Sequence, residues 1–95
     1  MEAMRDAFHV SPDALARELD GEVLVLDLRS SLYFGMTGTG ARIWRLIEAG
    51  EDRDAILATL AREYGVGAEA IEGDVDAFLA ELLDRGLVGR EVAAS

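Results

Sequence analysis

The chain has 95 residues, 51% of them hydrophobic, which is enough for the core of one small domain. Nine basic residues against 19 acidic ones give a formal net charge of −10 at pH 7. Such a charge disfavours nucleic-acid binding, which depends on neutralising phosphates. There is no cysteine, which excludes a disulfide framework and a thiolate metal site, and no apolar run is long enough to cross a bilayer. Because the start also lacks the features of a signal peptide, we expect a cytoplasmic protein without membrane contact.

The N-terminal part precedes a predicted hairpin. Residues 1–10 show little pattern and are expected to be disordered, so that a single domain spans residues 11–90. The segment ALARELDGEVLVLDL then contains Asp20-Gly21, a dipeptide favoured at a two-residue type I′ turn. This turn sets the register of the two strands, with three opposed pairs: Leu19 and Glu22, Arg17 and Leu24, Leu15 and Leu26.

The predicted sheet has one clearly apolar face. Five leucines share it: Leu15, Leu19, Leu24, Leu26 and Leu28. Val23, Val25 and Asp27 point the other way. A second turn at residues 29–31 leads to a third strand at residues 32–35, which completes an antiparallel meander. If the strand order follows the chain order, one edge of this third strand has no partner.

A glycine-rich elbow, GMTGTG, follows the third strand and turns the chain into a helix. Either Thr37 or Thr39 can cap this helix through its side-chain oxygen. Its buried stripe is expected to contain Ile43, Trp44, Leu46 and Ile47, and Gly50 suits its end.

Two further helices are predicted from apolar periodicity. The second begins near Asp52 and points five residues inward: Ala55, Ile56, Leu60, Ala61 and Tyr64. The third begins after Gly67, ends at Gly86 and repeats apolar residues along one face: Ile71, Val75, Phe78, Leu79, Leu82 and Leu83. Leu87 and Val88 then return to the core or form a short extension.

Three strands followed by three helices predict an α+β fold, not an alternating one. Three short helices with tight turns resemble a helix-turn-helix core, and the small sheet beside them makes the whole winged-helix-like.

Residues able to carry catalysis do not form a recognisable set. His9 is the only histidine and lies in the poorly patterned start of the chain. The serines lack a partner base, and GMTGTG lacks the lysine of a phosphate-binding P-loop. The sequence therefore predicts a binding protein that needs no catalytic residue, metal or cofactor.

The order of the segments resembles the PqqD-like family, the precursor-peptide recognition elements of ribosomal peptide natural-product pathways. The resemblance covers roughly residues 14–88. It rests on five groups: residues 24–28, Tyr33-Phe34, Thr39-Gly40, Ile43-Trp44, and the late run Val75, Phe78, Leu79, Leu82 and Gly86-Leu87. Met36-Thr37 departs from the family's usual Leu-Asn. The Thr-Gly-Thr-Gly segment and the free-standing length look most like the leader-binding proteins of lasso peptide clusters.

The resemblance implies that a disordered leader peptide adds as a strand to the third strand, with the third helix as a wall. The implied peptide-binding residues are Leu32, Tyr33, Phe34, Gly35, Asp74, Val75, Phe78, Leu79, Glu81 and Leu82. Asp74, Asp76 and Glu81 are expected to pair with basic leader residues. The helix flank that bears Asp74, Phe78 and Glu81 is expected to face the leader, and the flank with Asp76 and Leu79 is the alternative. A transglutaminase-like leader peptidase is the implied second partner.

Two other functions remain open from the sequence. One is a PqqD-type chaperone that presents a precursor to a radical enzyme. The other is a winged-helix DNA-binding protein, but DRDAILATLAREYG, the candidate recognition helix, carries two arginines against three acidic residues. That ratio argues against phosphate contacts.

Overall fold

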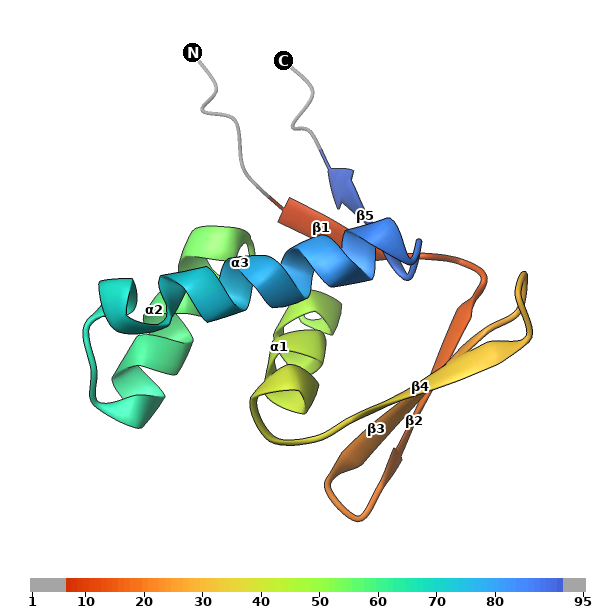
Figure 1. Cartoon of the computed structure of the whole chain (residues 1–95), viewed down its shortest axis with the longest axis horizontal. Helices are drawn as coiled ribbons and strands as arrows, with labels where there is room; N and C mark the ends of the chain where they lie inside the picture. The colour runs from red at the N-terminus through yellow and green to blue at the C-terminus, as the bar shows by residue number, and fades with distance from the viewer. Residues whose placement is uncertain (1–6, 92–95) are drawn as a thin grey trace.

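The computed structural model describes residues 7–91 as two small antiparallel sheets and three helices (Figure 1). In chain order the elements are β1 (Ala7–Val10), β2 (Ala14–Leu19), β3 (Glu22–Asp27), β4 (Leu32–Met36), α1 (Gly38–Glu48), α2 (Arg53–Tyr64), α3 (Ala68–Asp84) and β5 (Val88–Glu91). The predicted α+β class is confirmed, with a three-stranded sheet followed by three helices. A second, two-stranded sheet is added to it.

The hairpin of β2 and β3 has the predicted register. Leu19 lies opposite Glu22, and the pairing continues to Ala14 opposite Asp27. Asp20 and Gly21 both have positive φ, at 52° and 81°, as a type I′ turn requires. The strand order is β2-β3-β4, so within residues 7–91 the far edge of β4 pairs with no other strand.

The face of this sheet that bears the leucines is not the buried face. Val23, Val25 and Asp27 point into the molecule and are 2%, 0% and 6% exposed. On the opposite face Leu15 and Leu19 are more than half exposed. The leucines that alternate along the strands therefore lie on the solvent side of the sheet, and the β-branched valines lie on the core side.

The N-terminal strand β1 contradicts the expected disorder of residues 7–10. It pairs antiparallel with β5, with Phe8 opposite Arg90 and Val10 opposite Val88. Ala7 and Phe8 are buried. A four-residue segment carries too little periodicity to predict a strand whose partner lies about 80 residues further along the chain. Residues 1–6 lie outside the described part.

The first two helices build the core against the sheet. Trp44 of α1 and Ile56 and Leu60 of α2 are fully buried. Asp52 caps α2, because its Oδ1 accepts the Ala55 amide at 2.8 Å. Two details differ from prediction: Thr37 stands at the N-cap of α1 without a side-chain bond, and Tyr64 is 49% exposed.

The third helix, α3, runs across α1 and α2 toward the three-stranded sheet (Figure 1). Val75, Leu79 and Leu82 form its buried stripe, while Phe78 is only partly buried. Leu87 and Val88 are buried directly after it. Because α3 passes beside the open edge of β4, it makes one wall of the site described next.

Candidate functional site

Two neighbouring apolar hollows lie along α3, one between α3 and the first two helices and the other between α3 and β4; together we call them the groove. The first has a volume of about 280 Å³ and is lined by Thr39, Gly40, Ile43, Leu60, Tyr64, Ile71, Asp74, Val75 and Phe78. The second has a volume of about 180 Å³ and is lined by Phe34, Gly35, Met36, Phe78, Glu81, Leu82, Arg85 and Leu87. Phe78 lines both. Since pockets for drug-sized molecules span about 300–1,000 Å³, the two hollows suit single side chains better.

The glycine-rich elbow shapes the first hollow. A Cβ added to Gly40 would lie 3.2 Å from the Phe78 ring, so any larger residue would push that ring aside. Gly38 has a φ of +56°, a left-handed conformation that L side chains rarely adopt. The elbow therefore serves two purposes: it turns the chain from β4 into α1, and it lets Phe78 approach closely.

Two hydroxyl groups line the first hollow together with a carboxylate. The hydroxyls of Thr39 and Tyr64 are 2.5 Å apart and hydrogen-bonded. Asp74 lies on the exposed surface of α3, and no ion pair is found for it among the described residues. Thr39, Gly40 and Tyr64 were not among the predicted site residues. Tyr64 was assigned to the core, because its helical spacing matches the buried stripe.

The second hollow lies against β4 and carries an arginine. The Arg85 guanidinium stacks over the Phe34 ring, with its Cζ 4.7 Å from the ring centroid. Glu81 holds it from one turn earlier, since Oε2 accepts from Nε at 3.1 Å and from Nη2 at 2.9 Å. Arg85 was also not predicted as a site residue. Its signal was present, because it follows Phe78 and Glu81 at seven and four residues on the same helix flank.

The structure gathers most of the predicted residues in one place. Phe34 and Gly35 of β4 line the second hollow with Phe78, Glu81 and Leu82 of α3. Asp74 and Val75 line the first hollow, together with residues of α1 and α2. Leu32 and Tyr33 belong to the same strand and are 59% and 68% exposed. Leu79 lies apart, buried beside Phe8 and Arg90. The flank with Asp74, Phe78 and Glu81 therefore faces the groove, with Glu81 beside β4 and Asp74 beside the start of α1. The flank with Asp76 and Leu79 faces β1 and β5.

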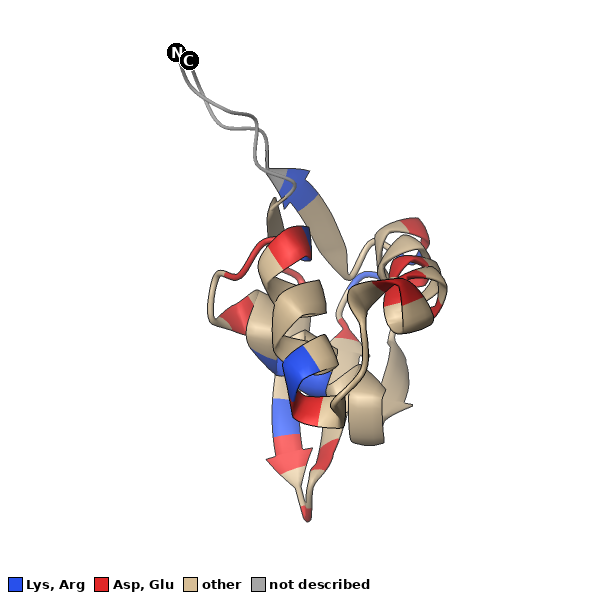
Figure 2. Cartoon of the chain, turned by 90° about the vertical axis from the view of Figure 1, so that its left-hand side faces the viewer, with Lys and Arg blue, Asp and Glu red and all other residues tan. Residues whose placement is uncertain are grey.

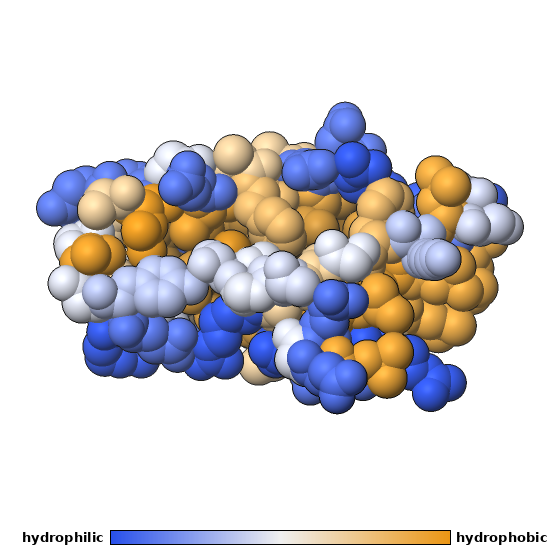
Figure 3. Space-filling view, turned by 60° about the horizontal axis from the view of Figure 1, so that its bottom comes forward, coloured by the Kyte–Doolittle hydropathy of each residue, from blue (hydrophilic) through white to orange (hydrophobic). Residues whose placement is uncertain are grey.

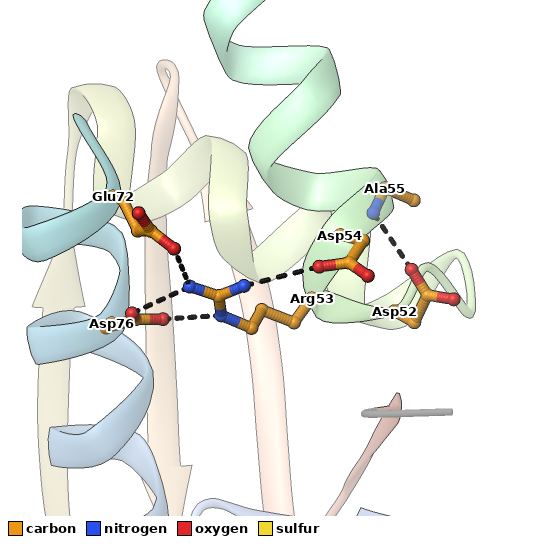
Figure 4. Close-up of polar contacts among 6 residues, drawn as sticks. All are labelled: Asp52, Arg53, Asp54, Ala55, Glu72 and Asp76. Carbon is orange, nitrogen blue, oxygen red and sulfur yellow. Dashed lines mark hydrogen bonds and ion pairs between the residues drawn. The ribbon is translucent and has the colours of Figure 1, made fainter. Parts of the chain in front are cut away.

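Asp76 is engaged in an ion-pair cluster on that second flank (Figure 4). Arg53 of α2 donates to both of its carboxylate oxygens at 2.8 Å and to Glu72 at 2.6 Å. The Arg53 hydrogen bonds lower the pKa of Asp76 and outweigh the opposing effect of its partial burial. The bonds from Asp76 and Glu72 raise the pKa of Arg53. Asp76 therefore ties α3 to α2, and its carboxylate is not free for a peptide.

The outward face of the sheet forms an exposed apolar surface next to the groove. We call it the leucine face, made of Leu15, Leu19, Leu24, Leu26 and Tyr33, with Arg17 and Glu18 beside it. Figure 3 shows the hydrophobic residues gathered over this sheet, at the right of the view. Exposed apolar patches of several hundred square ångströms often mark interaction sites.

The charges are spread over the molecule and form no basic stripe. Figure 2 shows arginines interspersed with acidic residues on the helices and the hairpin. Within residues 7–91 no cluster of three His, Asp or Glu side chains is placed to hold a metal ion. In that same part of the chain, no helix is long and apolar enough to span a membrane.

Comparison with known proteins assigns the chain to a family. The family model described as coenzyme PQQ synthesis protein D (PqqD) matches residues 22–88, most of the chain. The chain belongs to the PqqD family. A comparison with curated proteins gives no match.

Two solved structures are similar to this PqqD-family protein over nearly the whole chain. One is TbiB1 in complex with the TbiA(beta) leader peptide, with 32% identity, a TM-score of 0.80, and coverage of 92% of this chain and 99% of that one. The other is a lasso peptide synthetase B1 complexed with the leader peptide, with 26% identity, a TM-score of 0.78, and coverage of 86% and 96%.

The departure at Met36-Thr37 is accommodated locally. Met36 is 6% exposed and supplies the apolar plug between sheet and helix. Thr37 holds the N-cap position of α1 in an extended conformation without a side-chain bond.

Proposed function

We propose that this chain is a non-catalytic protein that binds the leader segment of a ribosomal precursor peptide of the lasso type and presents it to a leader peptidase. The observation that carries the proposal is the open edge of β4 beside the second hollow, which Phe78 separates from the first. The two similar solved structures are leader-peptide complexes, which supports the same use of the same fold.

The hairpin register identifies the backbone groups that a leader strand would meet. The turn bond joins Leu19 and Glu22, so alternate pairs of the β2–β3 ladder are hydrogen-bonded. Residues 23, 25 and 27 of β3 then point to β4, where their partners are Met36, Phe34 and Leu32. Tyr33 and Gly35 are left to present their N–H and C=O groups on the open edge. A leader strand would pair with these two residues.

The hollows would supply affinity that backbone bonds alone cannot. Ordering a disordered segment costs conformational entropy, so apolar anchors must offset it. Leader side chains that enter the two hollows would pack on either side of Phe78. Family resemblance implies that a tyrosine and a proline of the leader serve as these anchors.

The test uses one position on the open edge. Gly35→Pro removes an outward-facing donor, while Gly35→Ala keeps it and places a Cβ at an ordinary 3.6 Å from Leu24. We expect the proline variant to lose at least tenfold in leader affinity, measured by fluorescence anisotropy, and the alanine variant to bind as the wild type does. In hydrogen exchange, leader should protect the amides of Tyr33 and Gly35, whereas Phe34 is protected already. Equal binding by both variants would refute strand addition.

Presentation requires a second contact, and we assign it to the leucine face. Tyr33 lies on this face and its strand forms the open edge, so a leader strand beside β4 would extend the same surface. A peptidase docked there would contact both the recognition protein and the leader it cleaves. Its docking surface would need to be apolar to match the leucines.

Substitutions on the leucine face separate docking from leader binding. Leu15→Glu and Leu19→Glu should leave leader affinity unchanged, because both side chains lie on the strand farthest from β4 and are exposed. We expect them to slow leader cleavage by the peptidase of the same gene cluster at limiting protein concentration. Glu22→Leu, on the same face, is the opposite control and should not slow it. Unchanged cleavage by both glutamate variants would place the peptidase elsewhere.

The two remaining alternatives make different demands on the protein. A chaperone for a radical enzyme would use the same groove, and co-purification with such an enzyme instead of a peptidase would favour it. DNA binding would need several free cations on α2, but of its two arginines Arg53 is held by Asp76 and Glu72, which leaves only Arg62 exposed. Tight binding of a generic duplex at moderate salt would favour that alternative.

A further inference from the structure

Charged side chains of opposite sign stand at the two ends of the groove. Asp74 lines the first hollow, near the N-terminal half of α3, and Arg85 lines the second hollow, directly after α3. Apart from Glu81, which is paired with Arg85, these are the charged residues that line the two hollows. An extended peptide that runs along β4 and continues past its end to the start of α1 would pass both.

Arg85 retains hydrogen-bonding capacity in this position. A guanidinium has five N–H donors in one plane, and Glu81 takes Nε–H and one bond from Nη2 through a single oxygen. The remaining donors have no partner among the described residues. Stacking on Phe34 fixes the plane of the group, so these donors keep a defined direction.

The bond to Glu81 does not remove Arg85 from use. Glu81 and Arg85 are 56% and 43% exposed and form an i,i+4 pair on the helix surface. Such pairs are worth only about 0.3–0.5 kcal/mol, so a second carboxylate can share or replace the first. Arg29 lies close by, since a Cβ at Gly86 would meet its Nη2 at 2.5 Å. Its own ion-pair distances, 3.7 Å to Asp13 and 3.9 Å to Asp27, are longer than hydrogen bonds.

The separation of the two charges predicts a spacing in the ligand. Asp74 and Arg85 are 11 residues apart, which is about 16 Å along a helix. An extended strand covers that length in about five residues. Because the two charges have opposite signs, the pair also distinguishes one end of the bound strand from the other.

We propose that Arg85 is a specificity-determining residue that donates hydrogen bonds to a carboxylate of the bound peptide. The Asp74 carboxylate pairs with a basic residue about five positions away, so that the two fix the direction and register of the leader. This inference rests on the proposed leader-binding function. It concerns the peptide's charge pattern, which neither the backbone pairing nor the apolar hollows specify.

The experiment selects random twelve-residue peptides displayed on phage against three proteins: the wild type, Arg85→Gln, and Arg62→Gln as an exposed control on α2. Peptides that still bind the Gly35→Pro variant are discarded, so the survivors depend on the open edge. Circular dichroism verifies that each variant is folded. We expect wild type and Arg62→Gln to select an acidic position about five residues from a basic one. We expect Arg85→Gln to lose the acidic position and keep the apolar ones.

A selected peptide then provides a quantitative check by anisotropy. Replacing its acidic residue by the matching amide should weaken binding to the wild type about threefold to tenfold and have little effect on Arg85→Gln. An acidic preference that persists in Arg85→Gln, or is missing from the wild-type set, overturns the inference and leaves leader binding intact. If no peptide depends on the open edge, the proposed function fails and the inference fails with it.

Discussion

The two flanks of α3 do different work, although both carry aspartates and apolar residues at helical spacing. On one flank, which we call the clamp flank, Asp76 and Glu72 bind Arg53, and Leu79 is buried beside Phe8. The groove flank differs: Asp74 has no ion pair within residues 7–91, and Phe78 is only partly buried between two hollows. One flank holds the fold together, and the other leaves its side chains available.

This difference shows that a carboxylate's neighbours decide its role. Asp74 and Asp76 are two residues apart and equally polar in sequence. Arg53 comes from another helix, more than 20 residues away in the chain. It donates hydrogen bonds to Asp76 and makes none to Asp74. The expectation that Asp74, Asp76 and Glu81 form one acidic rim is therefore wrong for Asp76, which lies on the opposite flank and is paired with Arg53.

The largest expected effect comes from truncating one apolar residue on each flank. Leu79→Ala should lower the free energy of unfolding by about 2–5 kcal/mol, because a buried leucine is lost from the core. Leader affinity of the folded fraction should not change. Phe78→Ala should lower stability less and weaken leader binding strongly. Urea unfolding measures stability, and anisotropy titration measures leader affinity. If Leu79→Ala impairs binding as much as Phe78→Ala, the two flanks do not have different roles.

A smaller, pH-dependent effect on stability is expected from the ion pair between Arg53 and Asp76. Asp76→Asn should lower the free energy of unfolding by about 1 kcal/mol, since the pair is partly exposed to solvent. Arg53 holds the pKa of Asp76 below its ordinary value of about 3.9. The stabilisation is therefore complete above that value and is lost as the pH falls through the folded-state pKa.

Unfolding of the wild type and Asp76→Asn should be followed from pH 7 to pH 2.5. The difference between them should be constant at neutral pH and shrink in acid. Glu81→Gln is the matched control on the groove flank, where an exposed i,i+4 pair is worth only about 0.3–0.5 kcal/mol. A difference that grows in acid would contradict the assigned role of Arg53.

The smallest effect is expected at Asp74. Asp74→Asn should leave thermal unfolding unchanged and weaken binding of a leader with a basic residue by up to about 1 kcal/mol. Because the carboxylate is exposed, the loss should be greatest at low salt and fade at high salt. Glu69→Gln, earlier on the same helix, should leave leader binding unchanged at both salt concentrations. A salt-independent loss would mean that Asp74 acts through the fold and not through charge.

The candidate site was partly readable from the sequence. Local patterns predicted the strand that contains Phe34 and the apolar helix stripe that contains Phe78, and the family resemblance implied that both bind peptide. Arg85 and Tyr64 were missed: Arg85 was given no role, and Tyr64 was assigned to the core. Their functional position depends on contacts with Phe34 and with Thr39, which come from distant parts of the chain.

The sequence alone determined the local elements. Asp20-Gly21 fixed the hairpin and its register, and the apolar spacing of residues 71–83 fixed a long helix. These follow from backbone conformation and side-chain periodicity, which act between residues near in the chain.

Tertiary structure decided which surfaces are buried and which are open. Both faces of the three-stranded sheet carry apolar residues, so alternation could not tell the valine face from the leucine face. Only the docking of α1 on the valine side decided it. Likewise, apolar periodicity gave α3 two equivalent flanks. One flank packs toward α2, β1 and β5, because Arg53 pairs with Asp76 and β1 pairs with β5. The other flank is left facing the groove. Such choices depend on contacts between distant segments, which local patterns do not encode.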